Sequence, residues 1–328
     1  MKTAVNRYSL VAGLLIAFGL MGGSARAEFP EKQISIVVPF SPGGVTDVLG
    51  RLIGEGISSR LKQPVLIENR TGAGSMVGLE YFSRAPADGY VLFLVNPATA
   101  ALTVLFNDVR VDPSKVIAPV SLIATGEIGL VGTGTLPIRN WAEFVAYGKA
   151  NPGKLSYGNV GGFVALLGDY MVKRDNLDAV SVRYRGSSDV QQALVAGTLS
   201  VGIITATGLE AFTKDGRLKI LAVSGRKRSA SLPEVQTITE AGFSELDAAE
   251  MNYFGIGAPT GTPRAVIQRL NEVIADVVRS PAYRQRVASF DYEPVSSTPE
   301  KLGEVFFGSI RKWSEVARKI NYKPEAVQ

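Results

Sequence analysis

Apolar residues recur along this chain with two different periods, one typical of buried strands and one typical of helices. Residues 33–40 (QISIVVPF) form a nearly continuous apolar run of strand length, and residues 46–61 carry apolar side chains at helical spacing. A strand at 65–68, a helix from about 76 and a strand at 90–95 follow. This β-α-β-α-β order predicts a mostly parallel sheet covered by helices, the α/β class.

The same alternation continues to the C-terminus. Further strands are expected at 128–131, 155–157, 180–184, 201–204, 218–223 and 253–258. Further helices are expected at 141–150, up to about 173, from an N-cap at Ser187, Ser188 or Asp189 to near 197, at 263–278 and at 299–320. No change in composition marks a linker, which fits two α/β lobes joined by more than one crossing strand. A first lobe made of two separate segments is a hypothesis at this point.

The first 27 residues differ from the rest of the chain. Lys2 and Arg7 give a positive start, residues 10–20 are almost wholly apolar, and a small-residue run ends in Ala25-Arg26-Ala27. This is the pattern of a secretory signal cleaved after Ala27. The alternative is an uncleaved anchor, but the apolar core is shorter than the ~20 residues of a membrane span. We therefore expect export to the periplasm.

Composition excludes several kinds of chemistry. The 328 residues include no cysteine and no histidine, so disulfides, thiolate or imidazole metal sites and a Ser-His-Asp triad are ruled out. Removing the three bases of the N-terminal segment leaves 32 basic and 30 acidic residues, which is a poor match to a nucleic-acid partner. No carboxylate spacing resembles a calcium loop, so we expect neither metal nor cofactor.

Two stretches run from a predicted strand through a glycine turn into a helix: residues 37–47 (VVPFSPGGVTD) and 157–166 (YGNVGGFVAL). Bare loop amides at a helix N-terminus suit a carboxylate or phosphate, although ordinary strand-to-helix turns also contain glycine. Neither loop contains Lys or Arg, which favours an anion held by backbone N–H groups. Arg183 and Arg185 are the nearest cations in the sequence, with their direction left open. Asp47 fits either a helix-dipole partner or an acceptor for a ligand donor.

Two weaker motifs do not carry a function. Residues 71–78 (TGAGSMVG) resemble a dinucleotide fingerprint, but the glycine spacing differs from G-x-G-x-x-G. Residues 59–62 (SRLK) match S-x-x-K without the companion motifs of penicillin-recognising enzymes. We interpret the first as a tight turn and the second as a solvated helix end.

A series of longer stretches spans nearly the whole mature chain. FPEKQISIVVPFSPGGVTDVLGR comes first, followed by VLIENRTGAGSMVG and APADGYVLFLV. YGNVGG, VRYRGSSDVQQALVAGTLSVG, GRLKILAVSGRKRSASLPEVQTITEAGF and FGIGAPTGTPRAVIQRLN come after them. In content and order these stretches resemble the substrate-binding proteins of the tripartite tricarboxylate transporter family, often called Bug proteins. VLIENRTGAGSMVG and APADGYVLFLV resemble the family's most specific signatures, E-N-R-x-G-A-G and D-G-Y-T-L.

The resemblance implies a type II periplasmic-binding fold, with two α/β lobes, a hinge and a ligand in the cleft. Lobe 1 would comprise residues 28–126 and 249–328, and lobe 2 residues 127–248. A loop from each lobe would close on a carboxylate, often through backbone amides and waters. The ligand-binding residues expected from the resemblance are Ser41, Pro42, Gly43, Gly44, Thr46, Asp47, Asn96, Thr99, Gly158, Asn159, Gly161, Gly162, Phe163 and Thr205.

The chain also departs from the family pattern. Phe163 and Leu166 occupy positions where members often have serine and histidine, and Ala193 and Ser200 replace two common aspartates. The second loop is therefore more apolar than usual, which suggests an apolar or aromatic part in the ligand. The alternative is that Phe163 only packs its helix.

Two functions from different classes remain. The leading one is a monomeric receptor for a small organic acid, which delivers it to a membrane permease of the tripartite tricarboxylate type or acts as a sensor. The other is a secreted hydrolase that uses carboxylates such as Glu68. Binding needs no nucleophile or base, which favours the receptor in a chain without histidine or cysteine.

Overall fold

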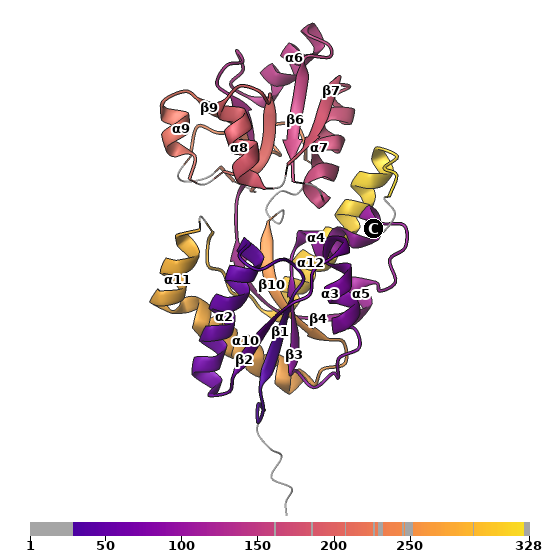
Figure 1. The fold of residues 1–328 in the computed structure, drawn as a ribbon, viewed down its shortest axis with the longest axis vertical. Helices are drawn as coiled ribbons and strands as arrows, with labels where there is room; N and C mark the ends of the chain where they lie inside the picture. Colours follow the sequence, from indigo (N-terminus) through magenta and orange to yellow (C-terminus); the bar gives the residue numbers. More distant parts are fainter. Residues whose placement is uncertain are drawn as a thin grey trace, which may run out of the picture. The chain divides into compact units, whose positions relative to one another are not determined.

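The computed structural model describes residues 29–324, apart from 161, 185, 207, 226, 229–231, 245, 247–251 and 291. The predicted signal segment lies outside the described residues. Within them the chain forms two five-stranded sheets with helices packed around each (Figure 1).

The first sheet has the strand order β2-β1-β3-β10-β4. Its strands are β1 (Ile34–Val38), β2 (Val65–Asn69), β3 (Val91–Val95), β4 (Ile117–Thr125) and β10 (Tyr253–Pro259). β1 pairs in parallel with β2 and β3, whereas β10 pairs antiparallel with β3 and β4. The chain thus leaves this sheet after β4 and returns to it in β10, after the second sheet is complete.

The second sheet repeats this arrangement in the order β7-β6-β8-β5-β9. It contains β5 (Ile128–Thr133), β6 (Leu155–Asn159), β7 (Ala179–Arg183), β8 (Val201–Thr205) and β9 (Leu218–Val223). β6 is parallel to β7 and β8, and β5 is antiparallel to β8 and β9. Because β10 is antiparallel to both of its neighbours, β4 runs in the same direction as β3, and for the same reason β9 runs in the same direction as β8. The expectation of a mostly parallel sheet is therefore correct for four strands of each sheet, and β10 and β5, which enter from the other sheet, run the opposite way.

Helices follow the parallel strands and pack on them. Around the first sheet lie α2 (Val45–Leu61), the short helix η1 (Ala73–Ser75), α3 (Met76–Phe82), α4 (Pro97–Leu105), α5 (Pro113–Val116), α10 (Arg264–Arg279), α11 (Pro281–Ala288) and α12 (Pro299–Lys319). Around the second sheet lie α6 (Trp141–Ala150), α7 (Gly162–Arg174), α8 (Ser187–Val195) and α9 (Glu210–Lys214).

The helix α12 shows how sequence spacing produces this packing. Leu302, Val305, Phe306, Trp313 and Val316 stand at positions i, i+3, i+4, i+11 and i+14, which lie on one face of a helix, and all are buried. Their shared face packs on β4, α4 and α7. The helix begins after Thr298, whose side chain accepts a hydrogen bond from the N–H of Lys301.

Most predicted elements are present, but some were missed. β4, α4 and α11 had no counterpart in the sequence-based assignment, and α8 is not capped by a serine or aspartate side chain. Its N-cap is Gly186, and Ser187 already belongs to the helix. The S-x-x-K stretch does end a helix, because Lys62 is the left-handed C-cap of α2, as expected for a solvated end.

Candidate ligand-binding site

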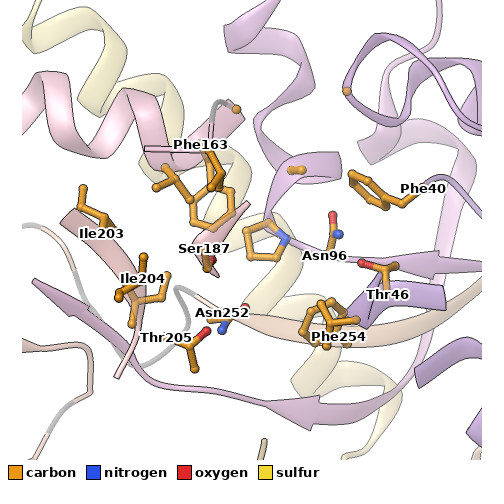
Figure 2. Close-up of a pocket in the computed structure, with 18 of the residues that line it drawn as sticks. Phe40, Thr46, Asn96, Phe163, Ser187, Ile203, Ile204, Thr205, Asn252 and Phe254 are labelled. Atoms are coloured by element: carbon orange, nitrogen blue, oxygen red, sulfur yellow. The ribbon is translucent and has the colours of Figure 1, made fainter. Parts of the chain in front are cut away.

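A cavity of about 410 Å³ opens where strands of both sheets end (Figure 2). Its wall includes residues at or just after the ends of β1, β3, β6, β7 and β8, so both sheets contribute to it. The carboxyl ends of parallel strands are where open α/β sheets bind ligands. The apolar lining residues are Phe40, Val45, Gly74, Pro97, Ala98, Ile128, Val160, Gly162, Phe163, Val164, Ile203, Ile204, Phe254 and Tyr292. The polar ones are Thr46, Asn96, Arg183, Ser187, Thr205 and Asn252.

Four helices begin at this cavity. The first turns of α2, α4, α7 and α8 line it through Val45 and Thr46, Pro97 and Ala98, Gly162 to Val164, and Ser187. The first backbone hydrogen bond of α2 runs from Val48 N–H to Gly44 O. The N–H groups of Val45 and Thr46 therefore have no carbonyl partner within the helix. Each helix N-terminus carries roughly half a positive charge. Four of them around one cavity favour an anion.

Asn96 is the most buried polar residue in the wall, with 6% of its surface exposed. It caps α4, and its Oδ1 accepts hydrogen bonds from Thr99 N at 3.1 Å and Thr99 Oγ1 at 3.3 Å. These two donors fix the orientation of the amide group. The Nδ2 of Asn96 has no hydrogen-bond partner among the described residues. A donor held this way can bind a carboxylate or carbonyl oxygen.

Arg183 is the one charged residue among the described residues that line this cavity. It ends β7, and its side chain makes no ion pair or hydrogen bond with another described residue. Its guanidinium is therefore available to a bound anion. Among the described residues, the cavity wall contains no carboxylate to compete with that anion.

A second cavity of about 360 Å³ adjoins the first and shares Gly74, Ala98, Gly162 and Arg183 with it. Its wall is more polar and includes Asn159, Asp169, Ser181 and Lys323. The Nδ2 of Asn159 donates to Ser181 Oγ at 3.0 Å, and the hydroxyl of Tyr157 donates to Asp169. Burial, with the Asp169 carboxylate beside it, raises the pKa of Tyr157, so the phenol keeps its proton.

Asp47 is occupied by its own loop and helix. Its carboxylate accepts hydrogen bonds from Gly43 N–H at 2.9 Å, from Arg51 Nε at 2.9 Å and Nη2 at 3.0 Å, and from Asn69 Nδ2 at 2.9 Å. Burial alone would raise the pKa of Asp47, but these donors outweigh it and the pKa lies below its ordinary value. Asp47 thus ties the first glycine loop to α2 and β2, and the Gly43 amide is used inside the protein.

The structure brings part of the predicted residue set together. Thr46, Asn96, Gly162, Phe163 and Thr205 line the main cavity, and Asn159 lines the second. Thr99 orients Asn96 from behind. Ser41, Pro42, Gly43, Gly44, Asp47 and Gly158 line neither cavity, and Gly161 lies outside the described residues. Whether these residues bind a ligand stays a prediction.

The departures from the family pattern have separate structural explanations. Phe163 lines the cavity and also packs on Trp313 of α12, with ring centroids 5.5 Å apart. Contact with a ligand stays a prediction for this residue. Leu166 is fully buried in α7. Ser200 joins β8 to β6, because its Oγ accepts from Ser156 N at 3.1 Å and its N–H donates to Ser156 Oγ at 3.2 Å.

Several lining residues were not identified from the sequence. Asn252 directly precedes β10, Phe254 lies in β10, and Tyr292 lies in the segment between α11 and α12. All three are far from both glycine loops in the chain. Phe254 and Tyr292 pack edge to face with centroids 5.4 Å apart. The order of the strands brings these residues to the cavity, and no local sequence motif predicts this position.

No group of three or more Asp or Glu side chains among the described residues is placed to hold a metal ion. A search of the same part of the chain finds no helix with the length and apolar character needed to cross a bilayer.

Comparisons with a family model, with related sequences and with solved structures agree on one family. The family model described as tripartite tricarboxylate transporter family receptor matches residues 49–322. BugT of Bordetella pertussis is 29% identical over 97% of this chain and 99% of its own length. The structure of R. palustris Rpa4515 with adipate is 28% identical with a TM-score of 0.74, covering 91% of this chain and all of that one. MatC from Rhodopseudomonas palustris with bound malate is 25% identical with a TM-score of 0.71, covering 88% of this chain and 99% of that one. The chain therefore belongs to the receptor family of tripartite tricarboxylate transporters, the Bug proteins, and has the α/β fold of periplasmic binding proteins.

Proposed function

We propose that this protein is a periplasmic receptor that captures a small carboxylate in the cavity between its two sheets, for uptake by a tripartite tricarboxylate permease or for sensing. The observation that carries the proposal is the first turns of four helices around a cavity whose described lining residues include one arginine and no carboxylate. Helix N-termini and an unpaired guanidinium both favour an anionic ligand. The adipate and malate in the two related structures support a carboxylate as that anion.

We further propose two lobes, residues 28–126 with 249–328 and residues 127–248, that close on the ligand. Sheet membership supports this division, because β1 to β4 and β10 form one sheet and β5 to β9 form the other. Gly126 N–H donates to Asn252 O at 2.8 Å, so the outgoing and returning crossings lie side by side. Paired crossings of this kind suit a hinge. Export by a cleaved signal segment before Glu28 completes the proposal.

The alternative of a carboxylate-dependent hydrolase has little support. Glu68 lines neither cavity and pairs with Arg70 at 2.8 Å. Burial would raise the pKa of Glu68, but the donors from Arg70, Ser35 and Tyr81 outweigh it and the pKa lies below its usual range. A carboxylate held ionised in this way is a weak base at neutral pH.

A thermal-shift screen against organic acids, combined with product analysis, tests the proposed function. A ligand at 100 times its dissociation constant should add about 2.7 kcal/mol of stability and raise the melting temperature. We expect at least one small carboxylate to do so without being converted. Turnover of a bound acid or ester would favour the hydrolase, and a screen in which no carboxylate stabilises the protein would contradict the receptor.

A further inference from the structure

The chemistry of the cavity wall restricts which carboxylates fit, given the proposed receptor function on which this inference rests. Four aromatic side chains line the main cavity: Phe40, Phe163, Phe254 and Tyr292. Figure 2 shows Phe163 together with the aliphatic side chains of Ile203 and Ile204 from β8. A wall of this composition gains most from an apolar ligand surface, because burial of apolar area is the main favourable term.

Phe163 is backed by a second aromatic side chain. Its ring packs on Trp313 with centroids 5.5 Å apart, and Trp313 is only 1% exposed within the face of α12 that packs on the first sheet. Phe163 therefore presents an apolar surface at the start of α7.

The charges facing the ligand amount to one positive charge. The main cavity has Arg183 alone. In the adjoining cavity Arg183 and Lys323 face Asp169, so the combined lining again carries a single net positive charge among the described residues. Arg183 is thus the one fully charged donor in the main cavity among the described residues, and the helix first turns add partial positive charge beside it. The aromatic and aliphatic part of the wall offers no such group to a second carboxylate.

We propose that the ligand is a monocarboxylate with an apolar body, aliphatic or aromatic, and that Phe163 is a specificity-determining residue that contacts this body. The carboxylate takes the donors of Asn96, the helix first turns and Arg183. A second carboxylate would lie either against the aromatic wall, without a partner, or in the adjoining cavity, where the Asp169 carboxylate offsets the charge of Lys323. Burying an unpaired charge is costly, and a like charge nearby adds to the cost.

Matched acids of equal carbon number test this proposal on the wild-type protein. Titration calorimetry would compare butanoate with succinate, hexanoate with adipate and octanoate with suberate. In each pair that binds, we expect the monocarboxylate to bind about tenfold tighter or more, as follows from the cost of desolvating the second charge. Equal or tighter binding of the dicarboxylates would overturn this inference and leave the receptor function standing. Failure of every organic acid in the wider screen would overturn both.

The role of Phe163 is tested with Phe163→Ser and with Phe290→Ser as a matched control. Phe290 is an exposed aromatic that lines neither cavity. Circular dichroism first confirms that both variants are folded. Phe163→Ser should lower the affinity for the best monocarboxylate about tenfold or more, because that much is expected from the loss of aromatic contact area. It should also reduce the ratio of this affinity to that for the dicarboxylate of equal carbon number. Unchanged preference in the folded Phe163→Ser variant, or an equal loss in Phe290→Ser, would overturn the assignment. If Phe163→Ser does not fold, the wild-type comparison above still decides the ligand class.

Discussion

Phe163 at the start of α7 and Trp313 in the middle of α12 pack ring on ring, 5.5 Å apart between centroids, and this contact joins a helix of the second sheet to a helix of the first. α7 also contacts α4. Phe163 therefore belongs both to the wall of the main cavity and to the contact between the two halves of the chain.

The Phe163–Trp313 contact should be measurable as a coupling energy. A double-mutant cycle with Phe163→Leu, Trp313→Leu and the double variant should give about 0.5–1.5 kcal/mol in urea denaturation, the range for packed aromatic pairs. Strict additivity of the two single changes would contradict a direct energetic contact. Variants that lack Trp313 keep only Trp141, so their tryptophan fluorescence differs from that of the wild type. Unfolding should therefore be followed by far-ultraviolet circular dichroism.

Asp47 should make stability depend on acidic pH. Its pKa is lowered in the folded protein below the ordinary 3.8, so its contribution is fully present above that value and is lost as the pH falls through the folded pKa. We expect Asp47→Asn to lower the free energy of unfolding by about 1–3 kcal/mol at pH 7, a typical cost for charge-assisted hydrogen bonds. The difference from wild type should shrink between roughly pH 4 and pH 2.

The control for this prediction is an exposed carboxylate on the same helix, Glu55. Glu55→Gln should leave the pH dependence of unfolding unchanged, because the side chain is exposed and no ion pair involves it among the described residues. A difference between Asp47→Asn and wild type that stays constant down to pH 2 would show that the carboxylate charge is not the cause.

Asn96 allows the ligand donor to be separated from the helix cap. Asn96→Asp keeps an acceptor for the N–H of Thr99 and suits the N-terminus of α4, so the fold should persist. The variant replaces an Nδ2 donor by a negative charge in the cavity wall. We expect carboxylate affinity to fall by more than about tenfold, since a like charge replaces a hydrogen bond. Asn96→Ser, which keeps the cap without the charge, should lose less, and equal affinity of Asn96→Asp and wild type in calorimetry would contradict the role of Asn96.

Ligand binding should be accompanied by closure of the two halves. The cavity is lined from both sheets. Gly126, where the chain passes from one sheet to the other, packs closely on two lining residues: a Cβ added to it would lie 2.7 Å from Tyr292 Cε1 and 2.8 Å from Asn252 Nδ2. A ligand that contacts both sides stabilises the closed state by its differential affinity. Small-angle scattering should show a smaller radius of gyration with saturating ligand, and an identical radius would indicate rigid binding.

The sequence predicted those parts of the fold that depend on local spacing. Apolar runs and glycine turns located β1, α2, β6 and the end of α7 to within two or three residues, because burial and helix initiation leave a local pattern. The strand β4 was missed because IAPVSLIAT has a proline and polar residues within its apolar run. The antiparallel β10 and β5 could not be assigned a direction, since that depends on where the chain crosses between sheets.

The candidate site was predicted to a similar extent. Thr46, Asn96 and Thr205 follow or end strands, where a ligand is expected, and they do line the cavity. Asp47 looked equally suited to a ligand until its partners Arg51 and Asn69 were seen. Tyr292 reaches the cavity from a segment without any motif, because tertiary packing on Phe254 brings it there.

The central claim is that an anion is held by helix N-termini, Asn96 and Arg183 at one cavity, and the most direct test compares a carboxylate with its neutral amide. The tightest-binding acid from the screen and its primary amide have nearly the same shape and differ in charge. Titration calorimetry at low salt should show the acid binding at least about tenfold tighter, a preference that weakens as salt rises. Equal affinity of acid and amide would contradict the account.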